Sequence, residues 1–224
     1  MRSRHTIRAG LLGLGLAGVT LAASPNAARA QEVFFSGSTT GGFNAGPTGA
    51  TAALLGLVYR NSTFNGTTSN GFLGIGSQPA TPNLDNLGSF TLNAPAAGSP
   101  VQTYNGNTFT LLVSFTAPAG ITGGQTLPAF TAQVTGSVTS TDVGGVFIDF
   151  NNNPQTFTFS SGGTTGSFQF AVNDVSVTPG QTVSLTGRIL SASQTTVPEP
   201  ASMTLLATGL AGLGAAARSR KNQK

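Results

Sequence analysis

The feature that most constrains the fold is a strict alternation of apolar and hydroxyl side chains along the middle of the chain. It is clearest in Asn107–Thr116, where the apolar members are Phe109, Leu111, Val113 and Phe115. Successive side chains of a β-strand point to opposite faces of its sheet, so this pattern predicts a strand with one buried and one solvated face. A helix would need apolar residues three or four positions apart, and no central segment sustains that spacing.

The same two-residue period recurs between residues 33 and 189. The other segments that show it are Val33–Phe35, Leu55–Tyr59, Phe72–Ile75, Phe90–Leu92, Phe130–Val138, Val146–Phe150, Phe157–Phe159, Phe168–Val172, Val175–Val177 and Val183–Ile189. Turn pairs such as Asn105-Gly106 and Pro179-Gly180 separate them. Many short strands joined by tight turns predict an all-β fold, with a single antiparallel β-sandwich, jelly-roll-like, over residues 31–190. The polar residues 191–196 are typical of a short linker.

Charge is concentrated at the two ends of the chain. Of the ten lysines and arginines, only Arg60 and Arg188 lie between residues 31 and 198. Two arginines against five carboxylates give this central region a net charge of −3. A nucleic-acid partner is therefore not expected, because such a partner requires clustered Lys and Arg on the binding face.

Several residue types with catalytic chemistry are missing from the central region. The chain has no cysteine, and its single histidine is His5, near the N-terminus. This excludes disulfides, thiolate metal sites and a cysteine nucleophile, and it leaves the central region without an imidazole base. We therefore expect no catalytic residues, no cofactor and no enzymatic activity.

Residues 1–30 have the three parts of a secretory signal peptide. A basic start is followed by a 15-residue apolar run, Ala9–Ala23, and then by small residues at Ala28 and Ala30 before Gln31. The apolar run is shorter than the ~20 residues of a membrane-spanning helix. We predict export and cleavage by signal peptidase before Gln31. The alternative is a retained N-terminal anchor.

Residues 197–224 have three parts in a fixed order. They are a Pro-Glu-Pro core within Val197, Pro198, Glu199, Pro200 and Ala201, then the uncharged stretch Ser202–Ala217, then a basic cluster of Arg218, Arg220 and Lys221. We predict a hydrophobic helix whose basic end stays on the cytoplasmic side of the membrane. The two prolines would keep the preceding peptide extended, a form that a membrane peptidase can bind.

This arrangement resembles the PEP-CTERM sorting signal. The resemblance implies recognition by an exosortase, a membrane cysteine peptidase, with cleavage near the Pro-Glu-Pro triplet and a host that makes exopolysaccharide or a biofilm. The protein would then be transiently anchored in the membrane before reaching the cell surface or the extracellular space. The alternative is a plain C-terminal anchor helix that is never cut.

Three features of the central region are candidate ligand sites. Asp149, Asn151 and Asn153 combine a carboxylate with amides and form a weak calcium candidate, although Asn-Asn-Asn-Pro is also an ordinary turn sequence. Tyr59 and Tyr104 are candidates for stacking on a sugar ring, and the alternative is the packing role that a tyrosine at a strand or turn edge more often has. Paired carboxylates of a glycosidase would have to come from the aspartates of the region, namely Asp142, Asp149 and Asp174.

The expected function is a structural or adhesive one at the cell surface or in the extracellular matrix, with exopolysaccharide as the candidate ligand. The alternative is a carboxylate-dependent enzyme that processes glycans. Leu57–Asn61 and Leu87–Leu92 loosely resemble the choice-of-anchor ectodomains that often precede such sorting tails. That resemblance implies an anchored ectodomain and no particular activity.

Overall fold

The computed structural model describes residues 32–44, 46–47, 49–76, 85–122, 129–196 and 208–209. Its strands are β1 (Phe34–Phe43), β2 (Thr51–Leu54), β3 (Leu57–Arg60), β4 (Thr63–Thr67), β5 (Leu73–Ile75), β6 (Ser89–Leu92), β7 (Gln102–Thr103), β8 (Asn107–Ala117), β9 (Ile121–Thr122), β10 (Ala129–Val138), β11 (Gly144–Phe150), β12 (Gln155–Ser161), β13 (Thr164–Val172), β14 (Val175–Val177), β15 (Thr182–Ser184) and β16 (Gly187–Thr196). The predicted all-β class is confirmed. The predicted signal helix and the predicted hydrophobic C-terminal helix fall outside the described residues, apart from Thr208 and Gly209.

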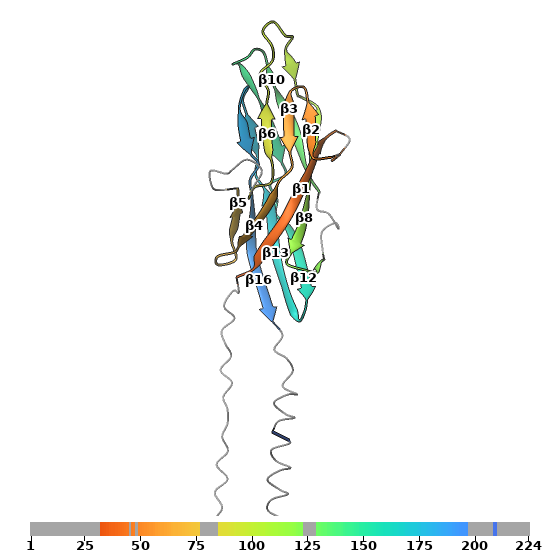
Figure 1. Ribbon diagram of the computed structural model, residues 1–224, viewed down its shortest axis with the longest axis vertical. Helices are drawn as coiled ribbons and strands as arrows, with labels where there is room; N and C mark the ends of the chain where they lie inside the picture. The colour runs from red at the N-terminus through yellow and green to blue at the C-terminus, as the bar shows by residue number, and fades with distance from the viewer. Residues whose placement is uncertain are drawn as a thin grey trace, which may run out of the picture.

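The strands form three antiparallel sheets. A seven-stranded sheet has the order β14-β11-β10-β8-β1-β4, with β7 pairing to β10. A five-stranded sheet has the order β5-β16-β13-β12-β9, and a four-stranded sheet has the order β15-β6-β3-β2. Figure 1 shows an elongated body in which β2, β3 and β6 lie toward one end and β12, β13 and β16 toward the other.

One apolar core joins the three sheets. It is built mainly from residues that the alternation assigned to the buried face, and Phe64, Leu87 and Tyr104 join it from outside the predicted strands. Phe109, Leu111 and Val113 on β8 are fully buried. Phe115 on the same strand packs among the rings of Phe35, Phe64, Phe157, Phe168 and Phe170, at centroid distances of 5.2 to 6.3 Å. Each buried ring contributes about 2–3 kcal/mol of transfer free energy, so this cluster is a main source of stability.

Two segments depart from the predicted strands. Leu55, placed in a strand by its hydrophobicity, is 48% exposed in the two-residue turn between β2 and β3. Leu55 and Gly56 both have positive φ, which suits the hairpin turn that the right-handed twist of the strands favours. Phe72 lies just before β5 and is 51% exposed.

The predicted polar linker at residues 191–196 is wrong. These residues are the second half of β16 and pair with β13 as far as Thr164↔Thr196. A register shift in this pairing, with Ser191 at positive φ, interrupts the alternation that marks the first half of the strand. Residues 191–196 therefore lack the alternating pattern of a strand, although their backbone pairing with β13 continues to Thr196.

Both tyrosines are core residues, so the prediction that they stack on a sugar is wrong. Tyr59 and Tyr104 are fully buried. The Tyr59 hydroxyl donates to Thr39 Oγ1 (3.0 Å) and to the carbonyl oxygen of Leu87 (2.6 Å), and the Tyr104 hydroxyl donates to the carbonyl oxygen of Leu55. Because burial disfavours the charged phenolate, it raises the pKa of both side chains above the ordinary value near 10.

We expect the stability of the domain to fall above about pH 10. Tyrosine in the unfolded chain ionises there while the buried Tyr59 stays protonated, so Tyr59 should lower the free energy of unfolding by up to about 1.4 kcal/mol per pH unit. Urea unfolding followed by circular dichroism between pH 8 and pH 11 measures this slope. Tyr59→Phe, though less stable at pH 8, should show a clearly smaller slope, because the Tyr59 hydroxyl is gone. An equal slope in the variant would show that the Tyr59 hydroxyl does not cause the pH dependence of stability.

The first and last strands meet at one end of the body. Gln194 Nε2, on β16, donates to the carbonyl oxygen of Glu32 (3.1 Å), just before β1, and Figure 1 shows the end of β16 at the lower tip. The chain therefore continues toward its C-terminal tail from this end. The turns between β2 and β3 and between β10 and β11 lie toward the opposite end.

Candidate functional site

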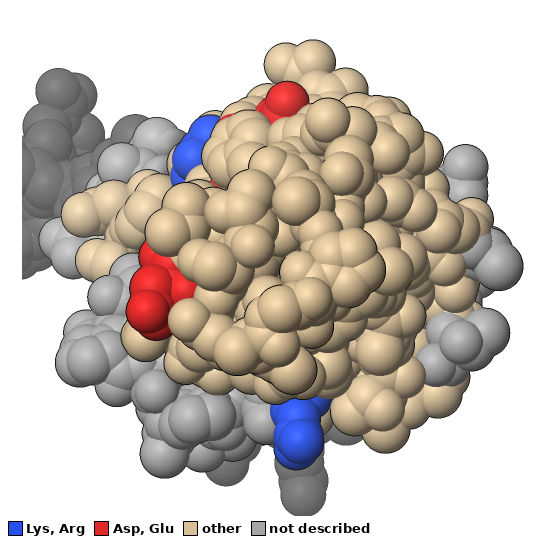
Figure 2. Space-filling view, turned by 90° about the horizontal axis from the view of Figure 1, so that it is seen from above, with Lys and Arg blue, Asp and Glu red and all other residues tan. Residues whose placement is uncertain are grey.

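The described surface is polar but nearly uncharged. Seen from the end that bears β2, β3 and β10, the molecule has charged side chains only near the rim of the view (Figure 2). The described part of the chain contains five acidic residues and two arginines, with no lysine. Serine, threonine and asparagine provide most of the polarity, so long-range electrostatic attraction of a partner would be weak.

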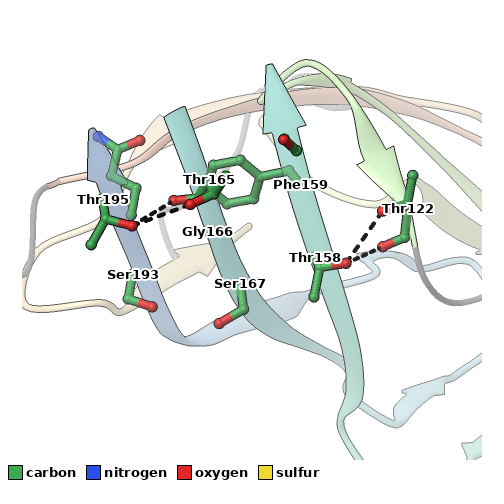
Figure 3. A pocket seen from close by; sticks show the side chains of 10 residues that line it. Thr122, Thr158, Phe159, Thr165, Gly166, Ser167, Ser193 and Thr195 are labelled. Carbon is green, nitrogen blue, oxygen red and sulfur yellow. Dashed lines mark hydrogen bonds between the residues drawn. The ribbon is translucent and has the colours of Figure 1, made fainter. Parts of the chain in front are cut away.

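One surface depression, of about 480 Å³, lies on the five-stranded sheet (Figure 3). Its lining is dominated by hydroxyl side chains. The lining residues are Thr122, Thr158, Phe159, Ser160, Thr165, Gly166, Ser167, Ser193, Gln194 and Thr195. Cross-strand register explains this composition, because Thr158, Ser167 and Ser193 are successive partners on the outer face of β12, β13 and β16.

Several hydroxyls of this depression are paired with one another. Thr158 Oγ1 donates to the carbonyl oxygen of Thr122 (2.9 Å) and lies 3.3 Å from its hydroxyl. Thr165 and Thr195 form a similar pair, with their hydroxyl oxygens 3.2 Å apart. These cross-strand pairs stabilise the sheet, each by a fraction of a kcal/mol up to about 1 kcal/mol. They leave fewer hydroxyl groups available to a ligand.

A second depression, a groove of about 620 Å³, lies where the chain passes from β11 to β12. Residues of β10, of β11, of the loop between β11 and β12, and the first residue of β12 line it. They are Ala129, Phe130, Thr131, Gln133, Asp149, Phe150, Asn151, Asn153, Pro154 and Gln155. Phe130 and Phe150 also border the groove, but they are only 3% exposed because their side chains pack in the core. Gln133 and Asp149 are cross-strand partners on the outer face of β10 and β11.

Asp174 fixes the loop that forms one wall of this groove. Its carboxylate accepts hydrogen bonds from the backbone N–H of Phe150 (2.8 Å) and from Asn152 Nδ2 (2.9 Å). Within the loop, the backbone N–H of Asn153 donates to Asn151 Oδ1 (3.2 Å). These contacts are those of an Asx turn held by a neighbouring carboxylate, and they define the shape of the wall.

The three residues of the calcium candidate, Asp149, Asn151 and Asn153, do lie together in this groove. One of the expected oxygen ligands, Asn151 Oδ1, already accepts a backbone hydrogen bond. Nowhere in the described ranges do three or more acidic, histidine or cysteine side chains form a group that could hold a metal ion. The local geometry favours the turn interpretation, and calcium binding stays a prediction.

The aspartates proposed as a catalytic set do not all come together. Asp142 lies in the loop before β11, and Asp149 lies near the other end of that strand. At about 3.3 Å per residue, the strand separates them by more than 15 Å. Paired glycosidase carboxyls are about 5 to 9.5 Å apart. Asp174 directly precedes β14 and so lies beside the same end of β11 as Asp149, but its oxygens hold the loop.

The residues of the two export signals lie outside the described part of the chain. This applies to the cleavage-site residues Ala28, Ala30 and Gln31, to the sorting motif Val197–Ala201, and to the basic cluster Arg218, Arg220 and Lys221. Within the described part, no helix is long and apolar enough to cross a bilayer. The predicted membrane segment, Ser202–Ala217, is described only at Thr208 and Gly209.

Comparison with known families identifies the C-terminal segment. Residues 196–221 match the model of the PEP-CTERM protein-sorting motif. The chain is thus a PEP-CTERM-containing exported protein, and the motif implies sorting at the cell surface through an exosortase. This confirms the resemblance seen in the sequence. No curated protein and no solved structure matches the chain.

Sequence reasoning did not find most of the groove. It singled out Asp149, Asn151 and Asn153, but not Thr131, Gln133 or Gln155 from the neighbouring strands. Alternation assigns a residue to a face of a sheet, whereas strand order decides which residues of that face are neighbours. The only available signal was the polar character of Gln133 and Gln155 beside buried phenylalanines.

Proposed function

We propose that this protein is a structural or adhesive component of the extracellular matrix, with exopolysaccharide as its ligand. The observation that carries the proposal is the PEP-CTERM motif at residues 196–221, because it implies delivery to the cell surface. The hydrophobic segment Ser202–Ala217 would hold the chain in the membrane until an exosortase cuts near Pro198-Glu199-Pro200. The remainder, a β-sandwich in this proposal, is then exposed to the matrix.

The surface chemistry of the β domain supports this role. Its outward side chains are mainly serine, threonine and asparagine, and these exchange hydrogen bonds with water and with sugar hydroxyls alike. The single core links all three sheets, as suits a rigid spacer. The last strand, β16, ends at one end of the elongated body (Figure 1). A tail anchored in the membrane would therefore place the opposite end away from the membrane.

A non-enzymatic role is part of the proposal. Of the three aspartates considered for catalysis, only Asp149 and Asp174 lie at the same end of β11. Both oxygens of Asp174 accept hydrogen bonds that shape the loop. A carboxylate whose two oxygens are both held in this way is not free to contact a glycosidic oxygen.

We expect the protein to co-sediment with the exopolysaccharide of the organism that makes it, in a saturable manner. Binding should be the same with and without EDTA, because Asn151 Oδ1 and the Asp174 carboxylate are occupied by hydrogen bonds of the loop. The measurement is the fraction of protein pelleted as the polysaccharide concentration rises, with a protein of similar size as control. Absence of binding would refute the polysaccharide role, and loss of binding in EDTA would instead favour a calcium site.

A further inference from the structure

We propose that the groove between β10, β11 and the loop at residues 151–154 binds a sugar unit of an uncharged polysaccharide, with Phe147 as an aromatic platform at its side. This inference rests on the proposed function, since it specifies where a polysaccharide would bind and of which class it would be.

The polar side chains of the groove are available to a ligand. Within the described residues, the carboxylate of Asp149 and the amides of Gln133 and Gln155 have no intramolecular hydrogen-bond partner. A carboxylate accepts hydrogen bonds, and a primary amide both donates and accepts them. Together they can bind neighbouring hydroxyls of a sugar ring. The depression on the five-stranded sheet is less suited, because Thr122, Thr158, Thr165 and Thr195 already pair there.

An aromatic surface for the C–H face of a sugar lies beside the groove, at Phe147. Phe130 and Phe150 line the groove but are only 3% exposed and add little to this surface. Phe147 lies two residues before Asp149 on the same face of β11, roughly 7 Å along the strand. Phe147 is 41% exposed, which is unusual for a phenylalanine in the middle of a strand. Its cross-strand partners Thr135 and Ser176 are small enough to leave the ring uncovered.

The charge of the groove restricts the class of polysaccharide. Asp149 is an uncompensated carboxylate, and no lysine or arginine is among the lining residues. A polysaccharide of uronic acids would bring carboxylates close to Asp149, and like charges at short range disfavour binding. Hydroxyls of a neutral sugar would instead donate to this carboxylate, and hydrogen bonds to a charged acceptor are stronger than neutral ones. The groove therefore disfavours an anionic polymer, and the ligand class that we infer is an uncharged one.

The test is native affinity electrophoresis of the full exported chain, purified from the envelope in mild detergent. The gels contain dextran, galactomannan or a β-1,3-glucan as neutral probes, and alginate as the anionic probe. We expect retardation by at least one neutral polymer and none by alginate. Phe147→Ala and Asp149→Ala should each weaken the apparent affinity about tenfold, as loss of an aromatic contact or of a charge-assisted hydrogen bond does.

Matched controls come from the other depression. Thr158→Ala and Thr195→Ala remove exposed side chains from the outer face of the five-stranded sheet and should leave the retardation unchanged. Gln133→Ala provides an independent change in the groove and should also weaken binding. Thermal unfolding of every variant establishes that the fold is retained, which is expected because all of these side chains lie on the surface.

The outcomes separate this inference from the proposed function. If the unmodified chain binds a neutral polymer and the Phe147, Asp149 and Gln133 variants bind it equally well, the groove is not the site and the proposed function stands. If alginate is bound as well as the neutral polymers, the inferred ligand class is wrong. If neither these polymers nor the exopolysaccharide of the producing organism is bound, both proposals fail.

Discussion

Replacing Gly88 with alanine is expected to leave little of the β domain folded. Gly88 has a φ of +118°, and an added Cβ would lie 2.4 Å from the ring and the hydroxyl oxygen of Tyr59. Tyr59 is fully buried against Phe90 and Phe109, with ring centroids 5.1 and 4.8 Å away, so it cannot move without disturbing the core. Backbone strain, overpacking and loss of the two Tyr59 hydrogen bonds together cost about 4 kcal/mol or more. This is comparable with the whole stability of a typical domain.

Gly98→Ala is the matched control for this substitution. Gly98 also has positive φ, +81°, but an added Cβ there would meet no heavy atom within 4 Å. It should therefore cost only about 1 kcal/mol, the contribution of the backbone conformation alone. Urea unfolding measures the loss of stability in both variants, and the difference between them is the cost of the steric clash with Tyr59. Similar losses in the two would show that the contact between Gly88 and Tyr59 does not limit stability.

Replacing Pro198 and Pro200 with alanine is expected to abolish processing of the C-terminal tail. Proline cannot continue a helix and keeps the residue before it extended, so the Pro-Glu-Pro segment should present an extended strand to the peptidase. Alanine at both positions would allow helix to continue from the hydrophobic segment and hide the peptide bond. The uncut chain should then accumulate in the membrane fraction, with the processed form reduced at least tenfold. Immunoblots of cell fractions and the intact mass of the purified protein measure both forms.

Glu199→Ala tests the middle residue of the triplet, and Thr195→Ala serves as control because it lies just outside the matched residues 196–221. The control should be processed normally. Processing of the double proline variant at the normal rate would contradict the role of the triplet. A tail that is never cut in the unmodified chain would mean that the hydrophobic segment is a plain anchor.

The amino-acid sequence by itself determined the fold class and the sorting motif. The alternation in residues 107–116 assigned Phe109, Leu111 and Val113 to the core, and all three are buried. This succeeds because the pleat of a strand is a local property with a period of two residues. The Pro-Glu-Pro triplet, the apolar segment and the basic end are contiguous in sequence, so the motif at residues 196–221 required no knowledge of the tertiary structure.

Tertiary structure alone decided which residues are neighbours. Tyr59 and Tyr104 have the same polar tip in the sequence as any surface tyrosine, yet their burial depends on packing between sheets. Residues 191–196 are part of a strand because their backbone pairs with β13. The groove joins Gln133 on β10 to Asp149 on β11. Such contacts arise from strand order and register over long sequence separations, and these are fixed by the cooperative burial of the whole core rather than by any local pattern.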